Sequence, residues 1–373
     1  MKRLLTALLV ALVLVAPARA AGPPPVDATA YLVVDGKTGE VLAARNAHEQ
    51  VAIASLTKLM TVLLTLQHEK LGNVVTVAPS AAAVGESSID LRTGEKLTVH
   101  DLLEGALIQS ANDAAYALAA YGGNGNVSRF VQEMNAEARA LHLRDTRYVR
   151  PDGLDAPGEH SSAADVTRLA RLLMQRQTVR QIVRMRTADI AGGRVLHTWN
   201  DLLGTFPGVI GVKTGHTNLA GWCQVAAVRG PGVTVYATIL GSPSRAQRNA
   251  DLARLLRWGL SRYRVASVIS EGRTYALAQT GYGRAPLHLV AAGRVRRTVG
   301  LDHPLVARVV ATSAVSLPVR AGQRLGTIRV FEGRRLIATR PLVAAHAVSR
   351  PSLPARVAFY ARRTAKHIWS WVT

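Results

Sequence analysis

Cysteine is nearly absent from this chain of 373 residues, since Cys223 is the only one. A single cysteine cannot form an internal disulfide, even in an exported protein. Cys223 lies in an apolar stretch with strand composition, so we expect a small core residue rather than a reactive thiol. The 11 histidines are scattered without the spacing of metal ligands, and no metal or cofactor is predicted.

Long apolar runs are also missing. The run at the N-terminus, Leu4–Val15, is short for a membrane-spanning helix. Two basic residues precede it and Ala18-Arg19-Ala20 follows it, which is the pattern of a secretory signal peptide cut before Ala21. We therefore expect residues 1–20 to be a signal peptide, with an uncleaved anchor as the alternative, and the rest of the chain to be exported.

Acidic residues are scarce, because 24 Asp and Glu stand against 46 Lys and Arg and leave a formal charge of +22. Residues 263–348 hold +10 of this charge and residues 349–373 hold +5, whereas residues 21–262 hold only +4. This concentration of positive charge predicts contact of the C-terminal third with an anionic envelope polymer or lipid. Nucleic acid is the other usual partner, but export argues against it and no recognition motif is present.

A serine and a lysine lie three residues apart at Ser55 and Lys58, at the head of an apolar run with helical spacing. One helical turn places both side chains on the same face. Burial lowers the pKa of a lysine, and a neutral amine can take the proton of a neighbouring hydroxyl. Alone, this pair is weak evidence for a catalytic site, because a serine and a lysine at this spacing also occur by chance.

Two further motifs follow in order. Ser110-Ala111-Asn112 supplies a second hydroxyl and a carboxamide, and Lys213-Thr214-Gly215-His216 precedes a strand-like run. Ser-x-x-Lys, Ser-x-Asn and Lys-Thr-Gly in this order are typical of the active-site-serine penicillin-recognising enzymes. An earlier copy, Lys37-Thr38-Gly39, stands in a Gly-rich turn between two predicted strands, and we interpret it as structural.

The remaining pattern predicts a mixed α/β (α+β) fold. A hairpin near the N-terminus, helices between residues 101 and 175, later strands and a closing helix at 245–260 imply one antiparallel sheet assembled from both ends of a domain. We expect this domain over residues 21–262. Short Val-rich runs broken by Gly and Pro predict a small all-β domain over residues 263–348.

The last 25 residues, 349–373, predict an amphipathic helix. Its apolar side would hold Val357, Tyr360, Ala361, Thr364, Ala365, Ile368, Trp371 and Val372, and its polar side Arg356, Arg362, Arg363, Lys366, His367 and Ser370. Phe359 and Trp369 depart from the pattern. A basic and an apolar face suit a helix lying in the headgroup plane of an anionic membrane, and a frayed or partner-packed helix is the alternative.

Residues 31–263 resemble the low-molecular-mass penicillin-binding proteins of the D-alanyl-D-alanine carboxypeptidase type. The resemblance runs through the three motifs, through Asp152-Gly153-Leu154 and through Arg245–Gly259. It implies a serine β-lactamase/DD-peptidase-like domain that releases the terminal D-alanine of peptidoglycan stem peptides and is acylated by β-lactams. A peripheral position at the periplasmic, extracytoplasmic face of the inner membrane is implied as well.

The resemblance also implies roles for the motif residues. Ser55 would be the nucleophile and Lys58 its base, while Ser110 passes the proton toward the leaving amine and Asn112 holds Lys58 and the substrate amide.

The Lys-Thr-Gly motif would bind the substrate. Lys213 would keep the local potential positive, Thr214 and Arg248 would bind the terminal carboxylate, and Gly215 would complete the motif. Backbone N–H groups of Ser55 and His216 would form the oxyanion hole.

Several alternatives remain open from the residues alone. The same motifs serve a D,D-endopeptidase that cuts crosslinks, or a penicillin-binding sensor or scaffold with a long-lived acyl group. Glu159 raises the question of a β-lactamase, in which a glutamate drives deacylation. Asn112 could instead be a helix cap, and Arg248 a solvated helix residue.

Overall fold

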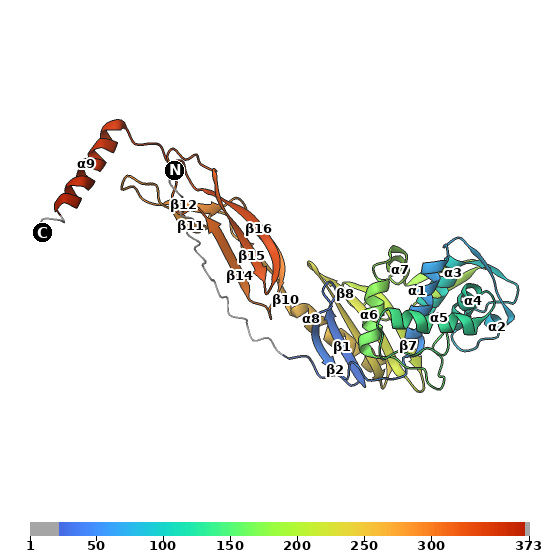
Figure 1. Ribbon diagram of the computed structural model, residues 1–373. Helices are drawn as coiled ribbons and strands as arrows, with labels where there is room; N and C mark the ends of the chain where they lie inside the picture. Colours follow the sequence, from blue (N-terminus) through green and yellow to red (C-terminus); the bar gives the residue numbers. More distant parts are fainter. Residues whose placement is uncertain (1–21, 370–373) are drawn as a thin grey trace. The chain divides into compact units, whose positions relative to one another are not determined.

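The computed structural model describes residues 22–369, so the predicted signal peptide lies outside the described residues. The chain divides into two compact units between Ser261 and Arg262 (Figure 1). No helix within residues 22–369 is long and apolar enough to cross a bilayer.

A five-stranded antiparallel sheet organises the first unit, with the strand order β2-β1-β9-β8-β7. Its strands come from both ends of the unit, since Ala30 of β1 pairs with Leu240 of β9. This confirms the predicted assembly, and it leaves β7, which contains the Lys-Thr-Gly motif, at the edge of the sheet. The strands are β1 (Ala30–Asp35), β2 (Val41–Arg45), β7 (Val209–Thr217), β8 (Gly221–Gly230) and β9 (Val233–Ser242).

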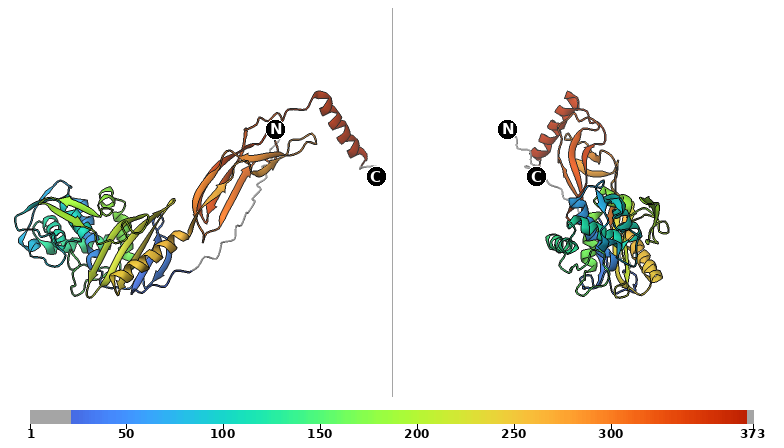
Figure 2. Two further views of the ribbon diagram at one scale, coloured as in Figure 1. Left: turned by 180° about the vertical axis from the view of Figure 1, so that it is seen from behind. Right: turned by 90° about the vertical axis from the view of Figure 1, so that its right-hand side faces the viewer.

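Helices flank this sheet. Helix α8 packs on one face, and the helices drawn in blue to green cover the other, as the right-hand view of Figure 2 shows. The first eight residues of α1, Lys58–Thr65, are all buried, because this helix lies inside the unit rather than on its surface. The helices are α1 (Lys58–His68), α2 (Pro79–Ala82), α3 (Val99–Glu104), α4 (Asn112–Gly122), α5 (Val127–Ala140), α6 (Ala163–Leu173), α7 (Gln177–Ile182) and α8 (Arg245–Ser261).

Local sequence signals explain much of this structure. The Ser162 hydroxyl caps α6 by accepting the backbone N–H of Asp165 at 3.2 Å, and serine is a residue that favours this position. The first of the helices predicted between residues 101 and 175 is α3, which is followed by a π-helical turn, Gly105–Gln109. Two small two-stranded antiparallel sheets, β3 (Val74–Thr76) with β4 (Lys96–Thr98) and β5 (Thr187–Ile190) with β6 (Arg194–His197), complete the unit.

The early Lys37-Thr38-Gly39 copy lies in the turn between β1 and β2. The Asp35 carboxylate accepts the backbone N–H groups of Lys37 and Thr38 at 2.9 and 2.7 Å, which fixes the turn. Gly39 adopts a φ of 79°, a conformation that favours glycine. The structural interpretation of this copy is therefore confirmed.

The second unit has its own apolar core and contains two antiparallel sheets, one of two strands and one of five in the order β11-β12-β16-β15-β14. This confirms the predicted all-β architecture. The two-stranded sheet pairs β10 (Tyr263–Ile269) with β13 (Val295–Gly300). The larger sheet contains β11 (Thr274–Ala278), β12 (Leu287–Ala291), β14 (Leu305–Ala311), β15 (Arg324–Glu332) and β16 (Arg335–Ala344).

A C-terminal helix, α9 (Leu353–Trp369), ends the described chain; the predicted positions Ser370, Trp371 and Val372 lie outside it. Val357 and Tyr360 of the predicted apolar side are 66% and 52% exposed, and Ala361, Thr364 and Ala365 are exposed as well, so much of that side faces solvent. Phe359, which breaks the amphipathic pattern, lies 5.7 Å from Tyr282 between ring centroids. This contact gives a physical reason for an aromatic residue in the polar sector.

Candidate active site

Ser55 lies in a 3-10 turn, Ala54–Thr57, that leads directly into α1. The turn packs against β7, where Gly215 leaves no room for a side chain. A Cβ at Gly215 would lie 3.0 Å from the backbone N of Ser55 and 3.0 Å from the carbonyl of Ile53. The glycine of the Lys-Thr-Gly motif therefore permits the close approach of β7 to the Ser55 backbone.

Lys58 follows at the first position of α1, and its side chain is completely buried. Its Nζ lies 2.7 Å from each of three oxygens: Ser55 Oγ, Asn112 Oδ1 and the carbonyl of Asp152. Burial lowers the pKa of Lys58 to about 8, although nearby carboxylates, with Asp152 foremost, act in the opposite direction. An amine with this pKa is partly neutral near neutral pH and already contacts the hydroxyl whose proton it would accept.

The second motif adopts an unusual backbone conformation. Ser110 follows the π-helical turn with a φ of 66°, which is left-handed and aims the hydroxyl at Lys213. Asn112 begins α4, but its side chain does not cap that helix. The side chain instead donates to the carbonyl of Gly85 at 3.1 Å and accepts from Lys58. The cap alternative for Asn112 is therefore wrong.

Lys213 on β7 is the second buried amine of the site. Its Nζ donates to Ser110 Oγ at 2.7 Å and to the Thr214 carbonyl at 2.8 Å. Burial lowers the pKa of Lys213 well below its ordinary value, and the positive charges of Lys58 and Arg248 act in the same direction. Two ammonium groups cannot both stay charged at low cost in one buried site. The neighbouring charges of Lys58 and Arg248 therefore disfavour a charge on Lys213.

Arg248 is not a solvated helix residue, because only 1% of it is exposed. It lies on α8, where its guanidinium stacks 5.6 Å from the Trp222 ring centroid and contacts Asp201 at 3.3 Å. Burial lowers the pKa of Arg248 to about 10. Trp222 in turn lies 4.1 Å from the ring of His216 on β7. Arg248 thus supplies a positive charge next to the ring pair of Trp222 and His216.

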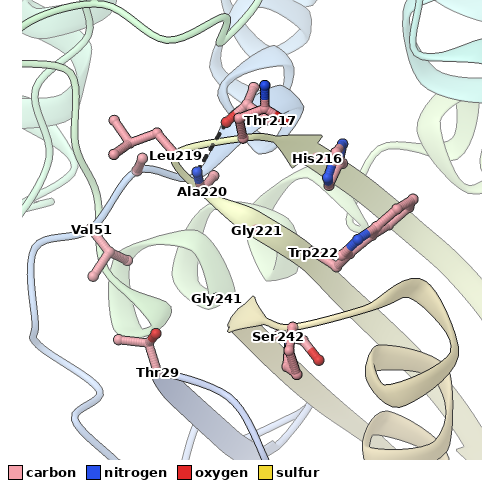
Figure 3. A pocket seen from close by; sticks show the side chains of 13 residues that line it. Thr29, Val51, His216, Thr217, Leu219, Ala220, Gly221, Trp222, Gly241 and Ser242 are labelled. Atoms are coloured by element: carbon pink, nitrogen blue, oxygen red, sulfur yellow. Dashed lines mark hydrogen bonds between the residues drawn. The ribbon is translucent and has the colours of Figure 1, made fainter.

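A pocket of about 420 Å³ opens beside His216 (Figure 3). The β7–β8 turn from His216 to Trp222 forms one side of it, Thr29 and Val51 form another, and Gly241 and Ser242 form a third. The turn is held by a hydrogen bond within it, drawn as a dashed line. The pocket therefore adjoins the strand that contains the Lys-Thr-Gly motif.

A loop, residues 149–160, joins the motifs through contacts that sequence reasoning missed. Asp155 Oδ1 accepts the Thr217 hydroxyl of β7 at 2.6 Å, and Glu159 Oε1 accepts the Thr57 hydroxyl at 2.8 Å. The loop thereby connects β7 to the Ser55 turn. The Pro and Gly residues of this stretch predict a turn region, and the resemblance includes Asp152-Gly153-Leu154, but neither signal indicates these contacts.

Cys223 is buried in β8, and burial raises the pKa of its thiol to about 11. This confirms the interpretation of an inert core residue. Within residues 22–369, no group of three or more His, Cys, Asp or Glu side chains is arranged to hold a metal ion.

The family profile of the D-alanyl-D-alanine carboxypeptidases matches residues 17–244, which is more than half of the chain. The chain belongs to this family. Family membership confirms both the resemblance and the enzyme class, a serine-type D-alanyl-D-alanine carboxypeptidase.

Individual relatives agree with this assignment. The chain is 31% identical over 354 residues to the D-alanyl-D-alanine carboxypeptidase DacD of Escherichia coli, covering 91% of each chain. It is 28% identical over 331 residues to DacF of Bacillus subtilis, covering 85% of each chain.

Solved structures of this family have the same fold. Penicillin binding protein 6B of Escherichia coli matches with a TM-score of 0.65 at 29% identity, over 88% of this chain and 99% of that one. A mutant of a Streptomyces DD-transpeptidase matches with a TM-score of 0.61 at 31% identity, over 64% of this chain and 99% of that one. The predicted serine β-lactamase/DD-peptidase-like fold is confirmed.

Proposed function

We propose that this carboxypeptidase-family chain is exported and removes the terminal D-alanine from peptidoglycan stem pentapeptides through an acyl-enzyme on Ser55. One observation supports the proposal most strongly. Lys58 Nζ lies 2.7 Å from Ser55 Oγ, and the amine is fully buried with a pKa lowered to about 8. A serine hydroxyl needs such a neighbouring base to become a nucleophile at neutral pH.

Acylation begins when neutral Lys58 takes the hydroxyl proton of Ser55. The Oγ then forms a bond to the carbonyl carbon between the last two D-alanines. Backbone N–H groups of Ser55 and His216 would stabilise the oxyanion. The proton passes through Ser110 to the leaving nitrogen, the C–N bond breaks and D-alanine leaves. Asn112 would hold Lys58 and the substrate amide in place.

The substrate carboxylate has a place in this scheme. We propose that it binds at Thr214 of the Lys-Thr-Gly motif, with the buried charge of Arg248 behind it. A carboxylate there would raise the pKa of Lys213, so the positive charge would move toward Lys213. A charged Lys213 disfavours a second charge at Lys58, which leaves Lys58 neutral when the substrate is in place.

Hydrolysis completes the cycle. Water attacks the ester carbonyl, Lys58 takes a proton from the water, and the proton returns to Ser55 Oγ as the ester bond breaks. A β-lactam would acylate Ser55 by the same attack, with the ring amide in place of the peptide bond.

The pentapeptide assay tests the substrate. We expect the mature chain, residues 21–373, to release D-alanine from pentapeptide monomers, whereas Ser55→Ala should release at least 10³-fold less. No D-alanine from monomers would reject the carboxypeptidase. Cleavage of crosslinked dimers instead would indicate the endopeptidase. An acyl group that persists for hours after a β-lactam pulse, without peptide turnover, would indicate the sensor or scaffold.

We further propose that α9 binds an anionic membrane surface, which would place the enzyme peripherally at the extracytoplasmic face of the inner membrane. The exposed apolar residues of α9 and its basic side support this proposal.

Deleting residues 355–373 should abolish binding to phosphatidylglycerol vesicles. Arg362→Gln with Arg363→Gln should weaken binding roughly 30-fold, at about 1 kcal/mol per charge. Co-sedimentation measures both effects, with vesicles of zwitterionic phosphatidylcholine, which have no net charge, as the control. Undiminished binding after the deletion would defeat the proposal.

A further inference from the structure

Glu159 is a half-buried carboxylate beside the nucleophile turn that the scheme above does not use. Its Oε1 accepts the hydroxyl of Thr57 at 2.8 Å, and Thr57 directly precedes Lys58. Its Oε2 accepts the backbone N–H groups of Arg150 and Val149 at 3.0 and 3.3 Å. Three donors from two segments therefore converge on one carboxyl group.

These contacts connect the loop to the helix that holds Lys58. The carbonyl of Pro151 accepts the Thr61 hydroxyl at 2.6 Å, and the carbonyl of Asp152 accepts Lys58 Nζ at 2.7 Å. Glu159 fixes the start of the same segment through the N–H groups of Arg150 and Val149. Hydrogen bonds thus connect Glu159 to the segment whose carbonyl binds Lys58.

Glu159 also interacts electrostatically with Lys58. Its negative charge raises the pKa of Lys58, second only to that of Asp152 among the acids. Burial raises the pKa of Glu159 itself to about 7, against the three hydrogen bonds that it accepts. The charge of Glu159 also raises the pKa values of Arg150, Tyr116 and Tyr148. The charge of Asp152 in turn raises the pKa of Glu159. Together with Lys58, these are the titratable groups that interact with Glu159.

We propose that Glu159 is a positioning residue that holds the Val149–Leu154 segment against the Ser55 turn and sets, by its charge, the pH range in which Lys58 acts as a base. This inference rests on the proposed function of Lys58. The two effects are separable, because hydrogen bonding fixes geometry whereas charge fixes the protonation of the amine.

Two variants at the same position separate them. Glu159→Gln removes the charge and leaves no second acceptor for the backbone N–H groups. In the pH profile of the β-lactam acylation rate, we expect the acid limb to move to lower pH by roughly half to one unit, because Lys58 loses its proton more easily. The plateau rate should fall a few-fold, roughly 3–10-fold, through looser geometry. Glu159→Asp keeps the charge, so the acid limb of its pH profile should stay near that of the wild type. Its shorter side chain loosens the geometry, so its plateau rate should fall.

The measurement is the acylation rate with a fluorescent penicillin between pH 5 and pH 10, on the full mature chain. Glu133→Gln is the matched control, because Glu133 lies on α5 and pairs with Arg129 at the surface. A limb that does not move in Glu159→Gln, whatever the plateau rate, would overturn the proposal. A wild type that is not acylated at all would instead refute the function of Ser55.

A second test needs no catalysis. Thr57→Val removes the hydroxyl that lowers the pKa of Glu159, so that pKa should rise above its wild-type value of about 7. Carboxyl ¹³C NMR of glutamate-labelled protein reports this titration, and the resonance is assigned by its loss in Glu159→Gln. If the Glu159 carboxyl titrated at the same pH in Thr57→Val as in the wild type, the hydrogen bond between Thr57 and Glu159 would be absent in solution. That result would also overturn the proposal.

Discussion

Replacing Lys58 by methionine is expected to slow the acylation of Ser55 by about 10²–10⁴-fold, the range for loss of a general base. Methionine retains most of the side-chain volume but cannot take the Ser55 proton. The three oxygens within 2.7 Å of Nζ lose their partner, which costs stability, while removal of a buried amine offsets part of that cost. The rate constant with a fluorescent penicillin measures the effect directly.

The control for this experiment is Lys37→Met. Lys37 belongs to the other Lys-Thr-Gly copy, in the exposed β1–β2 turn, and its replacement should leave acylation within about twofold of the wild type. If Lys58→Met were acylated as fast as Lys37→Met, Lys58 would not be the base.

Replacing Gly153 by alanine should have the second large effect. Gly153 has a φ of 81°, and a Cβ there would lie 2.1 Å from the carbonyl oxygen of Ala54. Backbone atoms cannot yield as a flexible side chain can, so either the loop or the Ser55 turn must move. We expect a loss of about 2–4 kcal/mol in the free energy of unfolding, with acylation reduced by at least 10-fold.

Gly94→Ala separates this clash from backbone strain. Gly94 also has a φ of 81°, but no atom lies within 4 Å of the Cβ that would be added. It should cost about 1 kcal/mol and leave acylation unchanged. Urea denaturation and penicillin acylation of both variants give the comparison. Equal losses would mean that the packing of Gly153 on Ala54 is unimportant.

Local patterns in the sequence were sufficient for the framework of the site. A spacing of three residues predicts a shared helical face for Ser55 and Lys58, and the structure places the two atoms 2.7 Å apart. The hairpin, α6 with its cap and the strands β7 to β9 also follow from short-range signals. The order of the three motifs predicted the family.

Long-range contacts were beyond the reach of these patterns. Glu159 meets Thr57 across 102 residues, and Lys213 meets Ser110 across 103. No spacing rule relates such positions, because only the folded chain brings them together. The burial of Arg248 against Trp222 has the same origin. The lowered pKa values of Lys58 and Lys213 depend on burial in the folded chain as well.

The central claim is a serine made nucleophilic by a buried amine, and intact-mass spectrometry after incubation with benzylpenicillin tests it most directly. The wild-type chain should gain the mass of one penicilloyl group, located by peptide mapping on the peptide that contains Ser55, and Ser55→Ala should gain none. Equal labelling of Ser55→Ala, or a label mapped to another residue, would contradict the account.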